Sequence, residues 1–375
     1  MGKQVILAVA GAGKTYHICH KIDPIKRNLI LAYTNENIYN IKKELCIAYG
    51  NIPDLTSVLT YDSFVYHNMI LPYEPSIGKH FNAVDFCSNG ISMMPPPNKQ
   101  IVTKSSKRIP NPKYEKKDKL EHYITKDNCY YCATMSELVL QVKKGRESLV
   151  KRIASRLNMF YDKILIDEFQ DFREYNYELI VKIAKQLNDV VLVGDYYQHS
   201  VSGSNNSGKP FKRKSSDVSY DEFLEQLKKE KFIVDTTTLE KSRRCSVNVC
   251  NYISTKLGIN IASQGINVGE VIWVDDNAEE IIENNNILKL VYQDSGKYTF
   301  NAMNWGYSKG DTVEHVCVIL IEKFDDMEKN DFVSEKIPIS TLNKLYVAMT
   351  RSKGDLYLIK GATFKKIKKK YIRSK

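Results

Sequence analysis

The sequence has no apolar run close to the roughly 18 residues that a membrane-spanning helix requires. Its start does not resemble a signal peptide either, because a strand-like run and a glycine-rich motif follow Met1 within a few residues. We therefore expect a cytoplasmic protein. The eight cysteines are better explained as reduced thiols than as a disulfide framework, and Cys129 and Cys132 lack the second pair that a zinc site needs.

The chain has little net positive charge outside two tracts, although its overall net charge is +11. Residues Lys99 to Lys119 include eight basic and two acidic side chains, and Lys360 to Lys375 include eight basic and none acidic. These tracts contribute +6 and +8, so the remainder of the chain carries −3. Each tract could hold phosphates, and the alternative is a solvated loop and a solvated tail.

The pattern of apolar residues alternates between strand-like and helix-like segments. Strand-like runs at Val5–Val9, Leu29–Ala32 and Ser57–Leu59 are each followed by a polar turn and a helical stretch. This order predicts an α/β protein with a parallel sheet covered by helices. Ligand-binding residues are then expected at the carboxyl ends of the strands.

The length of 375 residues exceeds what one hydrophobic core usually supports, so we expect more than one domain. Prolines and lysines interrupt the alternation after residue 70, and it resumes at Lys163–Ile166 and Val190–Val193. A Ser/Gly/Asn-rich stretch, Ser200–Ser219, predicts a flexible excursion. Strand-like runs then recur at Phe232–Val234, Val271–Val274, Val316–Ile321 and Leu356–Ile359.

From these breaks we predict three parts. Residues 1–70 and 157–230 form the first sheet unit, residues 71–156 form an inserted, mainly helical basic subdomain, and residues 231–375 form a second sheet unit with a basic C-terminal tail.

The segment Ala8–Thr15 (AVAGAGKT) predicts a phosphate-binding loop between a strand and a helix. Lys14 would neutralise charge on the β- and γ-phosphates, and the Thr15 hydroxyl would bind Mg²⁺. Position 8 is alanine where the general pattern has glycine, and the alternative is a simple glycine-rich turn. The expected nucleotide-binding residues are Ala10, Gly11, Ala12, Gly13, Lys14, Thr15 and Tyr16.

Two adjacent carboxylates follow the strand-like run Lys163–Ile166. Asp167 would hold Mg²⁺, while Glu168 would orient and deprotonate the water that attacks the terminal phosphate. Acidic residues after a strand commonly serve as helix N-terminal charges, but their combination with a phosphate loop favours hydrolysis.

Several motifs in this order resemble superfamily 1 helicases of the UvrD/Rep type. The AxxGxGKT loop resembles their first motif, and Asp167–Asp171 (DEFQD) resembles their DExQD. Similar correspondences are found at Thr34-Asn35, Thr60–Phe64, Leu192–Gln198, Leu239–Arg244 and Leu345–Ser352.

The resemblance implies two RecA-like halves in tandem that hydrolyse ATP with Mg²⁺ in the cleft between them. It assigns Gln198 as γ-phosphate sensor and Arg244 and Arg351 as arginine fingers, with Arg243 as the fallback. It also implies nucleic-acid contacts by Thr34, Asn35, Thr60 and Phe64.

The sequence departs from the UvrD/Rep pattern in three places. The motif around Ser308, Lys309 and Gly310 has Thr312 where UvrD-type proteins carry glutamate, and it is more similar to RecD-like relatives. We expect Ser308, Lys309 and Thr312 to contact nucleic acid, with Trp305 stacking on a base. The family's large insertion in the second half looks absent, and so does its upstream adenine-reading glutamine, so preference for ATP would depend on another contact such as aromatic stacking.

The leading prediction is an ATP-dependent translocase or helicase on single-stranded nucleic acid, DNA rather than RNA. The second is a nucleic-acid-sensing ATPase switch that controls a protein partner such as a nuclease. A P-loop kinase or GTPase is disfavoured, because Glu168 and the two arginines would have no role there and no Asn-Lys-x-Asp motif occurs.

Overall fold

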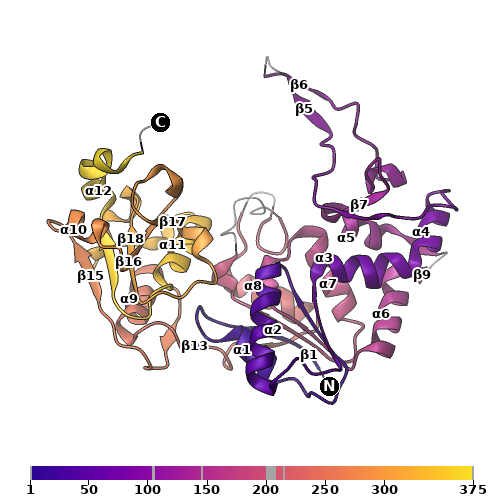
Figure 1. Cartoon of the computed structure of the whole chain (residues 1–375), viewed down its shortest axis with the longest axis horizontal. Helices are drawn as coiled ribbons and strands as arrows, with labels where there is room; N and C mark the ends of the chain where they lie inside the picture. Colours follow the sequence, from indigo (N-terminus) through magenta and orange to yellow (C-terminus); the bar gives the residue numbers. More distant parts are fainter. Residues whose placement is uncertain (1, 104–105, 145–146, 200–207, 214–215, 374–375) are drawn as a thin grey trace.

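Two parallel β-sheets organise the computed structural model, which describes residues 2–103, 106–144, 147–199, 208–213 and 216–373 (Figure 1). The predicted α/β class with two parallel-sheet units in tandem is confirmed. The basic insertion and the Ser200–Ser219 excursion are described only in part, since residues 104–105, 145–146, 200–207 and 214–215 lie outside those ranges. No helix within the described ranges is both long and apolar enough to cross a bilayer.

The first sheet has the strand order β12-β1-β11-β10-β2-β3, and all its strand pairs are parallel. Its strands are β1 (Lys3–Leu7), β2 (Asn28–Ala32), β3 (Thr56–Thr60), β10 (Lys163–Ile166), β11 (Val190–Gly194) and β12 (Ile233–Asp235).

Both faces of this sheet are covered, which explains why its central strands are almost continuously apolar. In β2, Leu29 and Leu31 pack on one side with residues of α5, α6 and α7, whereas Ile30 packs on the other with residues of α1 and α2. The helices are α1 (Lys14–His20), α2 (Asn35–Tyr49), α3 (Tyr61–Phe64), α5 (Cys132–Gln141), α6 (Leu149–Phe160), α7 (Glu174–Ala184) and α8 (Tyr220–Lys229).

The run Phe232–Val234, predicted to open the second unit, instead belongs to the first sheet. Strand β12 pairs with β1, with Gln4 opposite Ile233. An edge strand of three residues carries too little pattern to show which sheet it joins. The connection to the second unit therefore follows Asp235.

In the described residues the insertion is α-helical only near its ends, which corrects the prediction of a mainly helical subdomain. Between α4 (Glu74–His80) and α5 it contains four short strands, β4 (Gly90–Ser92), β5 (Gln100–Val102), β6 (Arg108–Pro110) and β7 (Cys129–Tyr131). The prolines around residues 95–97, 110 and 112 explain this, since proline interrupts helical hydrogen bonding. Figure 1 shows β5 and β6 at the far end of a projecting arm.

The second sheet has the order β15-β19-β18-β16-β17 and is also entirely parallel. Its strands are β15 (Val271–Val274), β16 (Ile287–Val291), β17 (Ala302–Asn304), β18 (His315–Ile319) and β19 (Leu356–Ile359). Its helices are α9 (Val247–Leu257), α10 (Ala278–Glu283), α11 (Ile339–Met349) and α12 (Gly361–Ile367).

The two units share apolar packing. One buried cluster contains Ile18 of α1 together with Val249 of α9 and Leu345 of α11. The predicted basic tail also packs, because Tyr371 is buried and Lys365 and Lys370 form ion pairs with glutamates of the second unit. The positive charge of the tail is thus partly neutralised.

Candidate active site

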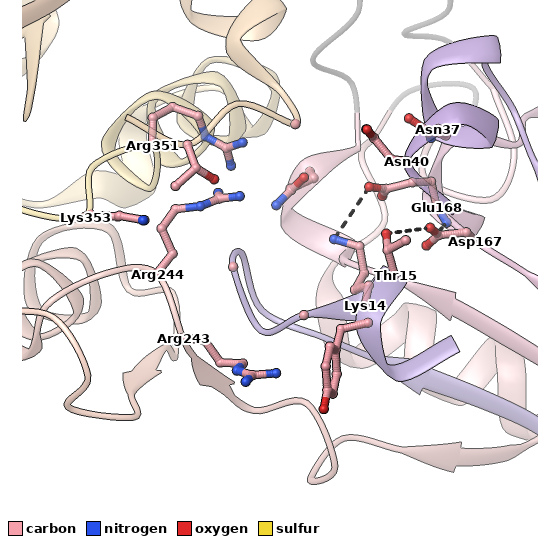
Figure 2. A pocket seen from close by; sticks show the side chains of 16 residues that line it. Lys14, Thr15, Asn37, Asn40, Asp167, Glu168, Arg243, Arg244, Arg351 and Lys353 are labelled. Atoms are coloured by element: carbon pink, nitrogen blue, oxygen red, sulfur yellow. Dashed lines mark hydrogen bonds and ion pairs between the residues drawn. The ribbon is translucent and has the colours of Figure 1, made fainter. Parts of the chain in front are cut away.

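A cavity of about 360 Å³ lies between the phosphate loop and the second unit (Figure 2). The first unit contributes Gly11, Gly13, Lys14, Thr15, Tyr16, Asn37, Asn40, Asp167, Glu168 and Gln198, and the second contributes Arg243, Arg244, Gly310, Thr312, Arg351 and Lys353. Residues far apart in the sequence thus converge on one site.

The phosphate loop joins the carboxyl end of β1 to the start of α1. Gly11 and Gly13 have φ values of 72° and 86°, a region that favours glycine. A side chain at Gly11 would also lie 2.7 Å from Cβ of Arg244. This glycine therefore permits the close approach of the two units.

Two of the predicted phosphate-loop residues lie behind the cavity surface. Ala10 and Ala12 are buried and do not line the cavity. The backbone N–H of Ala10 donates to the Tyr346 hydroxyl at 2.8 Å, so it is already engaged. Tyr346 was missed by sequence reasoning as a site residue, although it lies within the Leu345–Ser352 motif.

Thr15 and Asp167 form the pair expected at a magnesium site. The Thr15 hydroxyl donates to a carboxylate oxygen of Asp167 at 3.0 Å (Figure 2). Burial, together with the neighbouring Glu168, raises the pKa of Asp167 to about 6. A hydroxyl and a buried carboxylate are oxygen ligands of the kind that Mg²⁺ prefers, and a divalent cation would stabilise the charged carboxylate.

Glu168 lies between two lysines. Its carboxylate oxygens are each 3.7 Å from a lysine nitrogen, one from Lys14 and the other from Lys309. Burial alone would raise the pKa of Glu168, but the two lysines, together with the hydrogen bond from Gln170 and the charge of Arg351, outweigh burial and lower the pKa. The side chain is therefore ionised at neutral pH and can accept a hydrogen bond from a water molecule.

The backbone at Glu168 has a φ of 53°, which is uncommon for a residue other than glycine. Such strain is characteristic of functional positions whose surroundings fix the conformation. Here Gln170 supports the carboxylate by donating from its side-chain amide, while its amide oxygen accepts from the backbone of Asp195.

Arg244 and Arg351 reach the cavity from the second unit, opposite Lys14 (Figure 2). Arg351 is 1% exposed, and burial followed by the nearby charge of Arg244 lowers its pKa to about 9. It donates to the carbonyl oxygens of Val347 and Ser308, and Arg244 donates to that of Thr350. Neither arginine forms an ion pair with any carboxylate in the described ranges. Two cations without a carboxylate partner, Arg351 buried and Arg244 partly buried, favour an anionic ligand at this cavity.

Arg243, the fallback finger, also lines the cavity but is stacked on an aromatic ring. Its guanidinium carbon lies 4.6 Å from the ring centre of Tyr16, which also stacks on His20 with ring centres 3.8 Å apart. Gln198 lines the cavity and is 3% exposed. The structure therefore brings together Lys14, Glu168, Gln198, Arg244 and Arg351, the five residues predicted to be catalytic.

A second cavity of about 730 Å³, here called the cleft cavity, adjoins this site. Its lining includes Thr34 and Lys309, both predicted to contact nucleic acid, and the aromatic residues Tyr33, Tyr175 and Tyr307. Lys309 donates to both carboxylate oxygens of Asp171, at 2.6 and 2.7 Å. Glu168 and Gly310 line both cavities, so the two sites touch.

Three predicted nucleic-acid contacts are corrected by burial. Phe64 packs in the core of the first unit, and Trp305 is fully buried and donates from its ring nitrogen to the Leu290 carbonyl. Ser308 is also fully buried, and its hydroxyl donates to the Trp305 carbonyl. None of these side chains offers a surface to a polymer. Tyr307, which is 64% exposed, does.

The remaining predicted contacts lie in different places. Thr312 lines the cavity of the phosphate loop and not the cleft cavity. Thr34 and Thr60 cap helices α2 and α3, because their hydroxyls accept from the backbones of Asn37 and Ser63. Asn35 is exposed outside both cavities.

Comparison with known proteins agrees with the motifs. Residues 92–200, which include β10, the DEFQD motif and β11, match the family model of the UvrD/REP helicase N-terminal domain. The resemblance predicted from the motifs is thus confirmed over this segment. No curated protein sequence matches the chain.

The chain is similar to parts of solved structures of viral helicases. Arterivirus nonstructural protein 10 (helicase) is 13% identical with a TM-score of 0.46, covering 95% of this chain and 59% of that one. Its complex with DNA is 13% identical with a TM-score of 0.45, covering 95% of this chain and 60% of that one. The PRRSV helicase is 12% identical with a TM-score of 0.44, covering 99% of this chain and 55% of that one. The chain therefore spans less than two thirds of the length of these helicases.

Proposed function

We propose that this chain, which carries a UvrD/REP-type helicase N-terminal domain, hydrolyses ATP to move along or unwind single-stranded nucleic acid. The observation that carries the proposal is that Arg244 and Arg351, which have no carboxylate partner in the described ranges, face Lys14 across one cavity. The phosphates of a nucleoside triphosphate would provide the anionic partner that these arginines do not have.

Each unit has a distinct task in hydrolysis. Lys14 binds the terminal phosphates, Thr15 and Asp167 hold Mg²⁺, and Glu168 orients the attacking water and accepts its proton. When bound, Mg²⁺ neutralises phosphate charge. Arg244 and Arg351 stabilise the charge that develops on the γ-phosphate, and Gln198 contacts that phosphate. Because the arginines come from the second unit, the site is complete only when the units are close together.

The cleft cavity is the proposed track for the nucleic acid. It offers exposed tyrosine rings on which bases can stack, and it borders Glu168 and Lys309 beside the hydrolytic site. Preference for DNA over RNA rests on the resemblance of the motifs to UvrD/Rep helicases.

Steady-state ATP hydrolysis measured with and without single-stranded DNA or RNA, at two salt concentrations, tests this function. We expect strong stimulation that weakens as salt rises, and greater stimulation by DNA. Hydrolysis that ignores nucleic acid would contradict the track. It would favour the alternative in which the cleft controls a protein partner such as a nuclease.

Tyr307 should stack on a base, whereas Trp305 should not. We expect Tyr307→Ala to weaken binding of a single-stranded oligonucleotide about tenfold, because stacking contributes roughly 1–3 kcal/mol per base. Fluorescence anisotropy measures the affinity. Tyr39→Ala is the matched control, since Tyr39 is 67% exposed and lies outside both cavities. Equal affinities for Tyr307→Ala and wild type would exclude this contact.

A further inference from the structure

Arg173, two residues after the DEFQD motif, is a buried cation without a counterion. It precedes α7, lines the cleft cavity and is only 5% exposed. Buried charges are normally paired or hydrogen-bonded, because an isolated charge is costly to remove from water. The guanidinium of Arg173 has no ion pair or hydrogen bond to any residue that the structure describes.

Stacking fixes the position of this guanidinium. Its central carbon is 4.3 Å from the ring centre of Phe211, and the ring of His199 is stacked on the same phenyl at 4.2 Å with an interplanar angle of 5°. The arginine is thus held against the Phe211 ring by a cation–π contact, which uses none of its N–H donors.

The charges of the cleft cavity single out Arg173. Its lining contains two cations, and Lys309 is already paired with Asp171. The other ionisable side chains with charge at neutral pH are the carboxylates of Glu36, Glu168, Asp171 and Glu174. Arg173 is therefore the cation of this lining whose donors are free to meet an anion.

We propose that Arg173 binds one backbone phosphate of a single strand lying in the cleft cavity. This inference rests on the proposed function and adds a contact that the helicase motifs do not assign. A guanidinium matches the geometry of a phosphate through two parallel N–H donors.

The contact is joined to the nucleotide site through His199. This residue follows Gln198, and its carbonyl accepts from the side-chain amide of Asn343 in α11 at 3.1 Å. Burial, and then the charge of Arg173, lowers the pKa of His199 to about 3, so His199 is neutral and the stack carries a single charge. Binding of a phosphate to Arg173 would therefore affect the stack with Phe211 and His199, and through His199 the hydrogen bond to Asn343 of the second unit.

Oligonucleotides with one uncharged methylphosphonate linkage, moved stepwise along the strand, test the contact. With wild-type protein we expect one position to weaken binding about tenfold or more, because charge-assisted hydrogen bonds are stronger than neutral ones. With Arg173→Gln we expect the same loss for the unmodified strand and no further loss at that position. The salt dependence should also flatten by about 0.7 in log–log slope.

Arg152→Gln is the matched control, because Arg152 also stacks on an aromatic ring, that of Tyr73, but lies outside the cleft cavity. Should Arg173→Gln fail to fold, Phe211→Leu keeps the arginine and removes its support, and we expect a smaller loss at the same linkage. If wild type binds nucleic acid but each modified linkage weakens wild type and variant equally, the inference is wrong and the proposed function stands. If wild type binds no nucleic acid, the proposed function itself fails.

Discussion

Glu168→Gln is expected to reduce the turnover number for ATP by about 10² to 10⁴-fold, the range that positioned general bases provide. The amide keeps the shape of the side chain but can no longer accept a proton from water. Because Lys14, Thr15 and Asp167 remain in place, the affinity for nucleotide should change little. Single-turnover hydrolysis gives the rate, and titration with a fluorescent nucleotide gives the affinity.

Glu178→Gln provides the matched control for that experiment. Glu178 lies on α7, pairs with Lys182 at 2.7 Å and lines neither cavity. It should hydrolyse ATP at the wild-type rate. Retention of wild-type turnover by Glu168→Gln would show that another group activates the water.

Arg351→Gln is expected to lower the turnover number by about 10³-fold or more, since an arginine finger contributes roughly 10³ to 10⁵ in rate. Its guanidinium lies in the second unit, so the loss should be accompanied by little change in binding to the phosphate loop. The measurement is steady-state hydrolysis with nucleic acid present at saturation.

A structural contribution of Arg351 must be separated from a catalytic one, because its side chain also donates to the carbonyls of Val347, Ser308 and Asp311. Arg351→Lys keeps the charge but loses most of these donors. We expect it to retain more turnover than Arg351→Gln at similar thermal stability. Equal turnover in the two variants would argue against a role of the positive charge.

Much of the fold could be predicted because parallel strands buried on both faces have continuous apolar runs. Strands β2, β10, β15 and β19 lie within a residue or two of the predicted runs. The short edge strand β12 and the proline-rich insertion could not be predicted well. Their conformation depends on which neighbour they meet and not on their own periodicity.

The hydrolytic site was predictable for a related reason. Asp167 and Glu168 directly follow β10, and Lys14 begins the helix after the loop that follows β1, so the sheet places all three at one edge. In contrast, Trp305 and Tyr307 are two residues apart and differ only in the face that packing covers. Arg173 and Tyr346 gain their significance from Phe211 and Ala10, partners far away in the sequence, which no local pattern reveals.

In the proposed cycle of ATP hydrolysis, the attachment of the phosphate loop to the second unit couples release of the products to separation of the units. Ala10 donates to Tyr346, and the carbonyl of Gly11 accepts from the backbone of Arg243 at 2.9 Å. The phosphate loop is therefore part of the interface between the two units. Separation of the units must break these bonds at the same moment that it withdraws Arg244 and Arg351. Release of the products and separation of the two units would then occur in a single kinetic step.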